Sequence, residues 1–289
     1  MEKPGISLGE AVHWAADEFT RCGIDNPFLD AELLLTATVG ITRSQLHLYR
    51  NDALTAGLAK TFVSLVQRRC RREPLAYILG QRAFYDIELE VNPDVLIPRP
   101  ETELLVEQAL AWLDARSERA LLVADIGTGS GAIAITLAHK LANLSVWAAD
   151  RSPVALDVAR RNVQRYHLHE RVSLVCSDLL SATTARFDLV AANLPYIPNG
   201  RLADLQPEVG EYEPRLALNG GELGLDVIAR LCRMLPSHCN PSALVLLEID
   251  EGQGSRVSQM LGAMLPHAAI NVLHDYAGFE RIVRAEIIP

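Results

Sequence analysis

A glycine-rich loop between an apolar segment and a helical pattern constrains the fold of this chain most strongly. Residues 120–126 (ALLVADI) are an apolar run, residues 127–131 (GTGSG) follow, and residues 132–141 have helical apolar spacing. Glycines permit a tight turn and let a ligand approach the main chain closely. The helix that follows presents free N–H groups and positive potential at its start. Strand, glycine loop and helix in this order predict a ligand site in an α/β domain.

The next acidic position indicates the kind of ligand. Asp150 follows a second apolar run, residues 144–149, and lies 23 positions after Gly127. In dinucleotide folds an acidic residue at about this spacing accepts hydrogen bonds from ribose hydroxyls, so we expect a nucleoside. Because Gly127, Gly129 and Ala132 also match the G-x-G-x-x-A fingerprint of nicotinamide enzymes, the loop alone does not choose the cofactor.

A turn after another apolar run adds a group that can bind an amide. Residues 187–192 precede Asn193, Leu194, Pro195 and Tyr196. The asparagine side chain offers one acceptor and two donors, so it can bind an amide or an exocyclic amine. Proline limits relaxation of the loop, and tyrosine supplies a flat face with a polar tip. An ordinary strand-to-turn exit is the alternative, because Asn and Pro are common in turns.

Three observations together favour S-adenosylmethionine over a nicotinamide. An acid, Asp125, stands just before the glycines, and the predicted strand at residues 171–177 leads into Asp178, which can meet an adenine amine. The third observation is the turn at Asn193. Because open α/β sheets bind ligands at the carboxyl ends of their strands, these residues predict one methyl-donor site.

Length and composition limit the remaining possibilities. The chain has 289 residues, enough for two domains with their own cores. It has no apolar run that could span a bilayer, and the start MEKPGISLGE lacks a signal pattern, so we expect a cytoplasmic protein without a membrane partner. The five cysteines have no C-x-x-C spacing, and we expect no metal site.

The charge is unevenly distributed. Residues 1–80 contain nine basic and nine acidic side chains, so residues 81–289 carry the whole net charge of −9. An acidic catalytic region repels phosphate backbones, which argues against stable nucleic-acid binding. Arg68, Arg69, Arg71 and Arg72 form a local basic cluster, read either as a solvated helix face or as a docking surface.

The pattern along the chain predicts three parts. Residues 1–74 read as a small helical domain, whose first helix begins at a capping box formed by Ser7 and Glu10. Residues 75–98 read as a linker with a β-hairpin, and residues 99–289 as the donor-binding domain. In that domain strands and helices alternate, which predicts a doubly wound, mostly parallel α/β sheet. Two last apolar segments, residues 270–273 and 281–288, are expected to pair antiparallel at one edge.

Over nearly its full length the chain resembles the peptide chain release factor N5-glutamine methyltransferases. The segments that carry the resemblance are residues 73–80 (EPLAYILG), 96–103 (LIPRPETE), 125–131, 193–197 and 213–218 (EPRLAL). The resemblance implies a class I, Rossmann-like methyltransferase, S-adenosylmethionine as donor, and the glutamine of a Gly-Gly-Gln motif in release factors as substrate. It also implies that the N-terminal helices recognise the protein substrate. We expect a monomer.

Other functions remain open on the sequence. The Asn turn is shared with adenine-N6 methyltransferases, so a nucleic-acid adenine-N6 or guanine-N2 methyltransferase is the main alternative. A nicotinamide oxidoreductase and a binding module without activity are two more.

The chain departs from the family pattern at two positions. Leu194 stands where the usual turn has a proline, and Leu179 where the family often has a tryptophan. The resemblance implies that the Asn193 side chain and the Leu194 carbonyl accept the two N–H bonds of the substrate amide, with Tyr196 against its plane. The candidate catalytic residues are Asn193, Leu194, Pro195 and Tyr196. The candidate donor-binding residues are Asp125, Gly127, Thr128, Gly129, Ser130, Gly131, Asp150, Asp178, Leu179 and Asn193.

Overall fold

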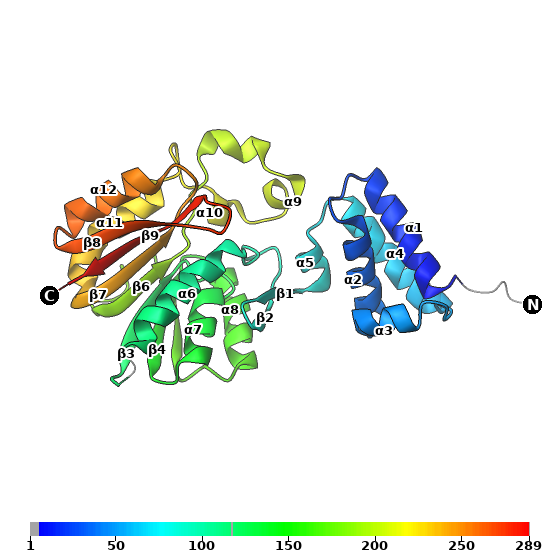
Figure 1. Ribbon diagram of the computed structural model, residues 1–289, viewed down its shortest axis with the longest axis horizontal. Helices are drawn as coiled ribbons and strands as arrows, with labels where there is room; N and C mark the ends of the chain where they lie inside the picture. The colour runs from blue at the N-terminus through cyan, green and yellow to red at the C-terminus, as the bar shows by residue number, and fades with distance from the viewer. Residues whose placement is uncertain (1–5, 117, 289) are drawn as a thin grey trace, which may run out of the picture. The chain divides into compact units, whose positions relative to one another are not determined.

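The computed structural model describes residues 6–116 and 118–288, and the chain divides into two compact units (Figure 1). Unit 1 runs to Gly80 and also includes Gln206–Tyr212, a segment from the second half of the chain. Unit 2 comprises Gln81–Leu205 and the chain from Glu213 onward. The residues expected to form a separate linker, 75–98, are therefore divided between the two units.

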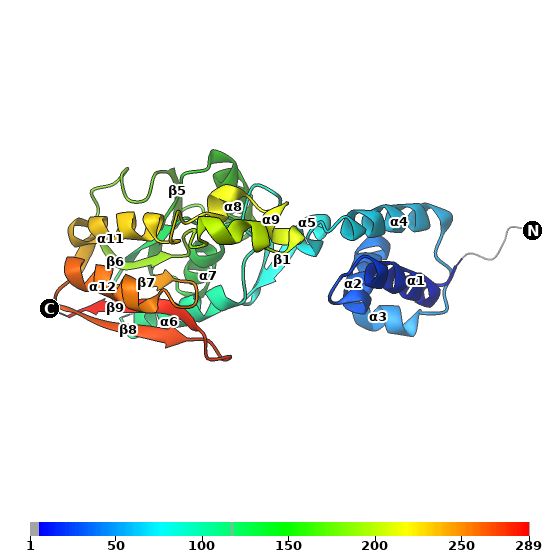
Figure 2. The same ribbon diagram turned by 90° about the horizontal axis from the view of Figure 1, so that it is seen from above.

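Unit 1 is helical. Its first helix, α1 (Leu8–Arg21), begins as the capping box predicts: the Ser7 hydroxyl accepts from the Glu10 N–H, and the Glu10 carboxylate accepts from the Ser7 N–H. Figure 2 shows α1 beside α2 and α3, with α4 along the group. The core includes Phe19, Leu34 and Phe62, all fully enclosed. The other helices of unit 1 are α2 (Pro27–Val39), α3 (Arg43–Leu48), α4 (Ala56–Cys70), α5 (Leu75–Leu79) and α9 (Pro207–Gly210).

The basic cluster of unit 1 is largely paired inside the unit. Arg69 is buried, and its guanidinium donates to Asp30 Oδ2 at 2.8 Å and to Glu208 Oε1 at 2.9 Å. Arg72 donates to Glu208 Oε2 at 2.7 Å, and Arg68 pairs with Glu73. Three of the four arginines thus hold unit 1 together, and Glu208 ties the returning segment, with α9, to α4.

Unit 2 begins with the antiparallel hairpin of β1 (Gln81–Phe84) and β2 (Ile87–Glu90) and continues into a seven-stranded sheet. The strand order is β5-β4-β3-β6-β7-β9-β8; neighbouring strands from β5 to β7 are parallel, and β9 runs antiparallel to both β7 and β8. Figure 1 shows β9 between β7 and β8, so the expected antiparallel pair does lie at one edge. The strands are β3 (Leu121–Ile126), β4 (Leu144–Asp150), β5 (Val172–Cys176), β6 (Phe187–Ala192), β7 (Cys239–Glu248), β8 (Ala268–His274) and β9 (Glu280–Ile287).

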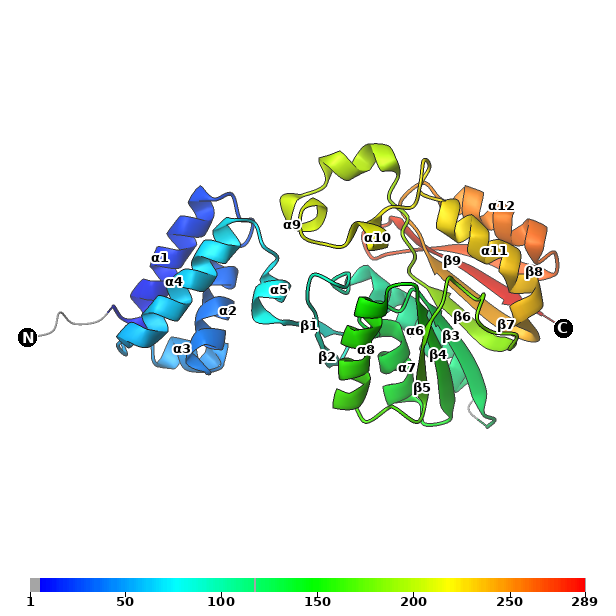
Figure 3. The same ribbon diagram turned by 180° about the vertical axis from the view of Figure 1, so that it is seen from behind.

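Helices cover both faces of this sheet, as Figure 3 shows. One face packs against α6 (Glu101–Asp114), α7 (Ala132–Lys140) and α8 (Pro153–Arg165). The other packs against α11 (Asp226–His238) and α12 (Gly254–Met264). Two short elements, the 3₁₀ helix η1 (Asn199–Asp204) and α10 (Arg215–Leu218), lie between β6 and α11. The prediction of a doubly wound, mostly parallel α/β sheet is confirmed.

The strand order locates the crevice where such sheets bind ligands. From β3 the chain builds outward through β4 and β5, then returns to place β6 on the other side of β3. The order of the strands therefore reverses between β3 and β6, and a crevice opens outside their carboxyl ends. The glycine loop follows β3 and the Asn turn follows β6, so the topology brings both to this crevice. In the parts of the chain that the structure describes, no helix is both long and apolar enough to cross a membrane.

Candidate active site

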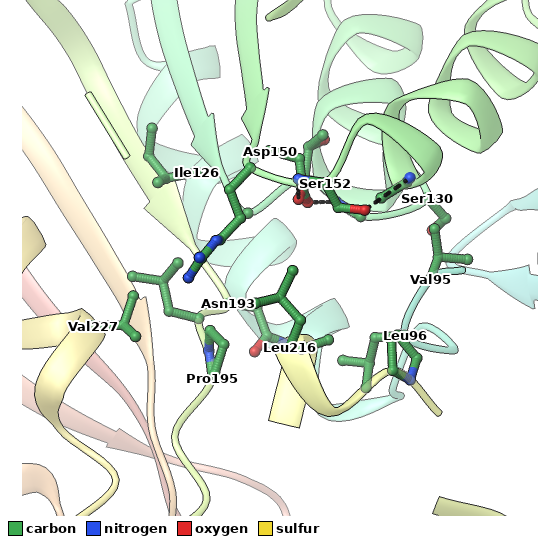
Figure 4. A pocket seen from close by; sticks show the side chains of 18 of the residues that line it. Val95, Leu96, Ile126, Ser130, Asp150, Ser152, Asn193, Pro195, Leu216 and Val227 are labelled. Carbon is green, nitrogen blue, oxygen red and sulfur yellow. Dashed lines mark hydrogen bonds between the residues drawn. The ribbon is translucent and has the colours of Figure 1, made fainter. Parts of the chain in front are cut away.

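A cavity of about 490 Å³ lies at the carboxyl ends of β3, β4, β5 and β6. This volume is within the range of small-molecule and cofactor sites. In Figure 4, Asp150 and Ser152 stand on one side of the cavity, and Asn193 and Pro195 on the opposite side. Ten of the residues expected from the sequence line it: Gly127, Thr128, Gly129, Ser130, Asp150, Asp178, Leu179, Asn193, Leu194 and Pro195.

The backbone conformation and close packing of the loop leave no room for a side chain at two of its glycines. Gly127 has φ +75°, and a Cβ there would lie 3.1 Å from Leu194 Cδ2. Gly131 has φ +87° and precedes α7, and a Cβ there would lie 2.7 Å from Ile135 Cδ1. Positive φ and close neighbours together require glycine at both positions. The loop therefore lets a ligand approach its main chain closely at the four residues that line the cavity, 127–130, whereas Gly131 does not line it.

Asp125 supports the loop from below rather than lining the cavity. It is 1% exposed, and its Oδ2 accepts from Thr128 Oγ1 at 2.6 Å and from the Ala134 N–H at 3.1 Å. Burial raises the pKa of its carboxyl to about 6. Its Oδ1 has no hydrogen-bond partner among the described residues. Without contacting a ligand, this unpartnered acceptor adds negative potential beside the cavity, which fits a ligand that carries positive charge.

Asp150 both lines the cavity and hydrogen-bonds to the glycine loop. Its Oδ2 accepts from the Gly129 N–H at 2.9 Å, and its Oδ1 accepts from the Ser152 N–H at 2.9 Å. Burial raises the pKa of this carboxyl as well. Each oxygen retains a further lone pair, so the carboxylate can still accept from two hydroxyls of a ligand.

Asp178 and Leu179 form the part of the cavity after β5. Asp178 makes an exposed ion pair with Arg230, which also lines the cavity. Leu179 is 6% exposed and has φ +55°, an uncommon conformation for a branched apolar residue. Such conformations cluster at ligand sites, where the surrounding structure holds them in place.

Asn193 is held in one orientation by two neighbours. Its Nδ2 donates to Glu248 Oε1 at 2.8 Å and to Thr102 Oγ1 at 3.0 Å. Thr102 in turn donates to Glu248 Oε2 at 2.7 Å. Because an asparagine amide has two N–H bonds, both donors are engaged, and Oδ1 is the group that remains for a ligand.

The rest of the turn is fixed by packing. Leu194 is 4% exposed and belongs to the core between the sheet and α11, where its side chain meets Gly127. Tyr196 does not line the cavity: its hydroxyl lies 3.4 Å from Glu248 Oε1, and its carbonyl accepts from Gln253 Nε2 at 2.9 Å. Burial thus holds Leu194 in place. In the usual turn of the family, a rigid proline stands at this position.

Sequence reasoning missed Thr102 and Glu248, and also the cavity residues Leu96, Leu216 and Arg230. Glu248 carried a usable signal, since it ends an apolar strand whose carboxyl end meets the same edge as the glycine loop. Burial raises the pKa of its carboxyl to about 7. Thr102 follows two prolines in a segment with no periodic pattern, so only the structure places it.

The fold and the site together define a class I S-adenosylmethionine-dependent methyltransferase. The strand order with its antiparallel β9, the glycine loop, and the acids after β4 and β5 are all present. The fold is similar to a 16S rRNA N2 G1207 methyltransferase of T. thermophilus, with TM-score 0.54 and 18% identity, covering 72% of this chain and 50% of that chain. A methyltransferase of Pyrococcus furiosus has TM-score 0.52 and 18% identity, covering 76% and 98%.

The chain belongs to the release factor glutamine methyltransferase family. It is 40% identical to the release factor glutamine methyltransferase of Geobacter sulfurreducens over 99% of both chains. It is 41% identical to the protein of that name from Gloeobacter violaceus over 88% of both. Residues 10–80 match the model of the PrmC N-terminal domain, and residues 105–210 match that of ribosomal protein L11 methyltransferase (PrmA). The family predicted from the sequence, methyltransferase activity and the donor S-adenosylmethionine are confirmed.

Proposed function

We propose that this chain methylates the side-chain nitrogen (N5) of the glutamine in the Gly-Gly-Gln motif of peptide chain release factors. The observation that carries the proposal is the state of Asn193, whose two amide donors are bound and whose Oδ1 is free to accept. A primary amide brings two N–H donors, which matches one side-chain acceptor beside one main-chain carbonyl. Relatives of this name over nearly the full chain support the same substrate.

The donor site follows from the glycine loop and two acids. Asp150 is proposed to accept from the ribose hydroxyls, and Asp178 from the adenine amine. Leu179 covers one face of the adenine with apolar atoms. Asp125 is proposed to act indirectly, by holding Thr128 and the start of α7. Thr128, Gly129 and Ser130 line the cavity and complete the cradle. When bound, S-adenosylmethionine supplies a methyl group activated by the sulfonium.

Positioning is the main task of the protein side chains, because an amide nitrogen is a poor nucleophile. We propose that Asn193 Oδ1 and the Leu194 carbonyl accept the two N–H bonds and aim the nitrogen along the axis of transfer. Held in this way, the amide nitrogen would take the methyl group from the bound sulfonium, which would leave as a neutral thioether, and one N–H proton would pass to solvent. Pro195 lines the cavity and restrains the turn. Tyr196, expected from the sequence against the amide plane, is proposed to act through its contact with Glu248.

Unit 1 is proposed to recognise the release factor. This is the role that the family resemblance implies for the helical domain expected at residues 1–74. A glutamine side chain alone offers too little surface for selection, so a second contact surface must supply affinity and orientation. We further propose that the protein acts as a cytoplasmic monomer and does not bind nucleic acid stably. The net charge of −9 on residues 81–289 supports the last point.

The deciding experiment uses labelled donor, a purified release factor and mass mapping of the product. A single methyl group on the Gly-Gly-Gln glutamine is expected. Methylation of adenine N6 or guanine N2 in nucleic acid, with the release factor unmodified, would instead establish the alternative enzyme class. Tighter binding of NAD than of S-adenosylhomocysteine would contradict the donor assignment.

The role of unit 1 is tested by comparing an intact release factor with a short Gly-Gly-Gln peptide. The full chain is expected to prefer the intact factor strongly. A chain that starts near Glu73 is expected to bind S-adenosylhomocysteine and to lose this preference. Equal loss on both substrates would indicate damaged folding, and no loss on the intact factor would refute the recognition role.

A further inference from the structure

Glu248 is a buried acid in contact with the Asn turn, and no part of the proposed reaction uses it directly. It ends β7 and is 2% exposed. Because β6 and β7 are parallel, with Ala192 opposite Leu247, Glu248 comes level with Asn193. Its two oxygens accept from three side chains, those of Thr102, Asn193 and Tyr196.

The directions of these hydrogen bonds identify the charge state of Glu248 that fits the site. Thr102 Oγ1 accepts from Asn193 Nδ2 and donates its own hydrogen to Glu248 Oε2. The other oxygen, Oε1, faces the Asn193 and Tyr196 donors. An ionised carboxylate accepts at both oxygens, whereas the protonated acid carries a hydrogen that would face one of these donors.

We propose that ionised Glu248, with Thr102, is a positioning residue that orients the Asn193 amide so that Oδ1 faces the substrate. The inference rests on the proposed function, because only an amide substrate brings N–H donors to this point. If Glu248 is neutral, the Asn193 amide can turn over and accept from it. The cavity then receives an NH2 group, and donor meets donor.

The negative charge has a second effect on the same group. Hydrogen bonds in a chain polarise one another, and the low local dielectric strengthens this coupling. An Asn193 amide that donates to a carboxylate therefore has a more electron-rich Oδ1, which accepts better from a nitrogen that gains positive charge during transfer. The contribution is largest in the transition state, where catalysis requires it.

The surroundings of Glu248 make this arrangement sensitive to pH near neutrality. Burial, with a smaller contribution from the Glu101 carboxylate on α6, raises the pKa of Glu248 to about 7. The hydrogen bonds from Thr102 and Tyr196 lower this pKa, as does the Arg281 charge on β9. Glu248 therefore becomes protonated as the pH falls through about 7, and the orienting contact is lost on the acid side.

Kinetics on an intact release factor at saturating donor test the role. At pH 8, Glu248→Gln and Thr102→Val are expected to lower kcat about tenfold to a hundredfold. Thr102→Ser keeps the hydroxyl, so its kcat is expected to stay within about threefold of wild type. The affinity of Glu248→Gln for S-adenosylhomocysteine is also expected to stay within about threefold of wild type. Below pH 7 the wild-type kcat should fall about tenfold per pH unit, an inflection that Glu248→Gln should lack. Wild-type kcat in Glu248→Gln, or the same inflection in both proteins, would overturn the proposal.

A measurement without substrate separates this inference from the proposed function. In protein labelled with ¹⁵N asparagine, the Asn193 side-chain signal is assigned by its loss in Asn193→Ala. It is expected to shift with a midpoint near pH 7 in wild type and not in Glu248→Gln. Absence of that titration refutes the orienting role. Failure of the wild type to methylate a release factor refutes the function and leaves the titration to decide the Asn193 contact.

Discussion

The Asn193 side-chain nitrogen lies 2.8 Å from Glu248 Oε1, and this contact between the ends of β6 and β7 determines which atom of the amide faces the cavity. With Thr102 accepting the second N–H, Asn193 acts toward a ligand as an acceptor alone. The same side chain free in a loop could present either end. The amide binding expected from the turn thus becomes a directed interaction.

Replacing Asn193 by alanine removes the side-chain acceptor for the substrate. We expect turnover to fall by on the order of 10² to 10³, the scale for loss of one preorganised transition-state hydrogen bond. Affinity for S-adenosylhomocysteine should change much less, because the donor is held mainly by the glycine loop and the acids. Near-normal turnover of Asn193→Ala with a release factor would show that the amide is bound elsewhere.

Replacing Asp150 by alanine should weaken donor binding by roughly 1.5 to 3 kcal/mol, the range for hydrogen bonds to a charged group. Two losses combine, since Asp150 also accepts from the Gly129 and Ser152 N–H groups and steadies the loop. Calorimetry with S-adenosylhomocysteine measures the change directly. Unchanged affinity would remove Asp150 from the ribose site.

Variants of Asp178 and Arg230 distinguish a ligand contact made by Asp178 from a surface ion pair between the two residues. The pair is exposed, so Arg230→Gln should cost less than about 1 kcal/mol of stability. Because this change leaves the Asp178 acceptor intact, affinity for S-adenosylhomocysteine should be kept, whereas Asp178→Ala should lower it. Thermal unfolding and calorimetry on both variants provide the comparison. Equal loss of affinity in both would mean that the pair, and not Asp178 alone, forms the adenine site.

The pH dependence of stability should reveal the buried acid. Folding raises the pKa of Glu248 from 4.5 to about 7, so ionisation costs stability as the pH rises through this interval. Between pH 6 and pH 8, wild type should therefore lose about 1 kcal/mol relative to Glu248→Gln. Denaturant unfolding of both proteins at the two pH values gives this difference. A difference between the two proteins that stays the same from pH 6 to pH 8 would mean that Glu248 is ionised throughout.

The buried Arg69 should contribute far more to the stability of unit 1 than the neighbouring Arg68. Arg69→Met leaves Asp30 and Glu208 without their shared cation and should destabilise unit 1 by about 3 to 5 kcal/mol. Arg68→Met is the matched control, since its pair with Glu73 is more exposed and should be worth less than about 1 kcal/mol. Unfolding of unit 1 followed by hydrogen exchange distinguishes the two. Similar effects would show that the Arg69 network adds nothing beyond surface charge.

Much of the fold was predictable because its signals are local. The capping box at Ser7, the apolar runs before the glycine loop and before Asn193, and the alternation of strands and helices each depend on neighbouring residues. Helix α11 was not predicted, although its apolar positions are buried against the sheet. Of the hairpin expected within residues 75–98, only β2 carries a period of two, whereas three of the four residues of β1 are exposed.

For the candidate site, too, the sequence predicted some features and not others. The positions of the glycine loop, Asp150, Asp178 and Asn193 follow from a general rule, that parallel strands present their carboxyl ends at one edge. The rule does not say which side chains turn into the cavity, so Asp125 and Tyr196 were expected there and instead support it from behind. Rotamer and direction depend on partners that the local sequence does not contain.

The order of residues along the chain was sufficient to determine an α/β donor-binding domain after a helical one, and the resemblance carried by its motifs identified the family. Tertiary structure alone decided that segment 206–212 joins unit 1 through Glu208, and that Thr102 and Glu248 hold the Asn193 amide. The reason is physical: helical and strand patterns arise between near neighbours, whereas these contacts join residues 55 to 139 positions apart. Hydrogen-bond direction and burial at such separations exist only once each unit has folded.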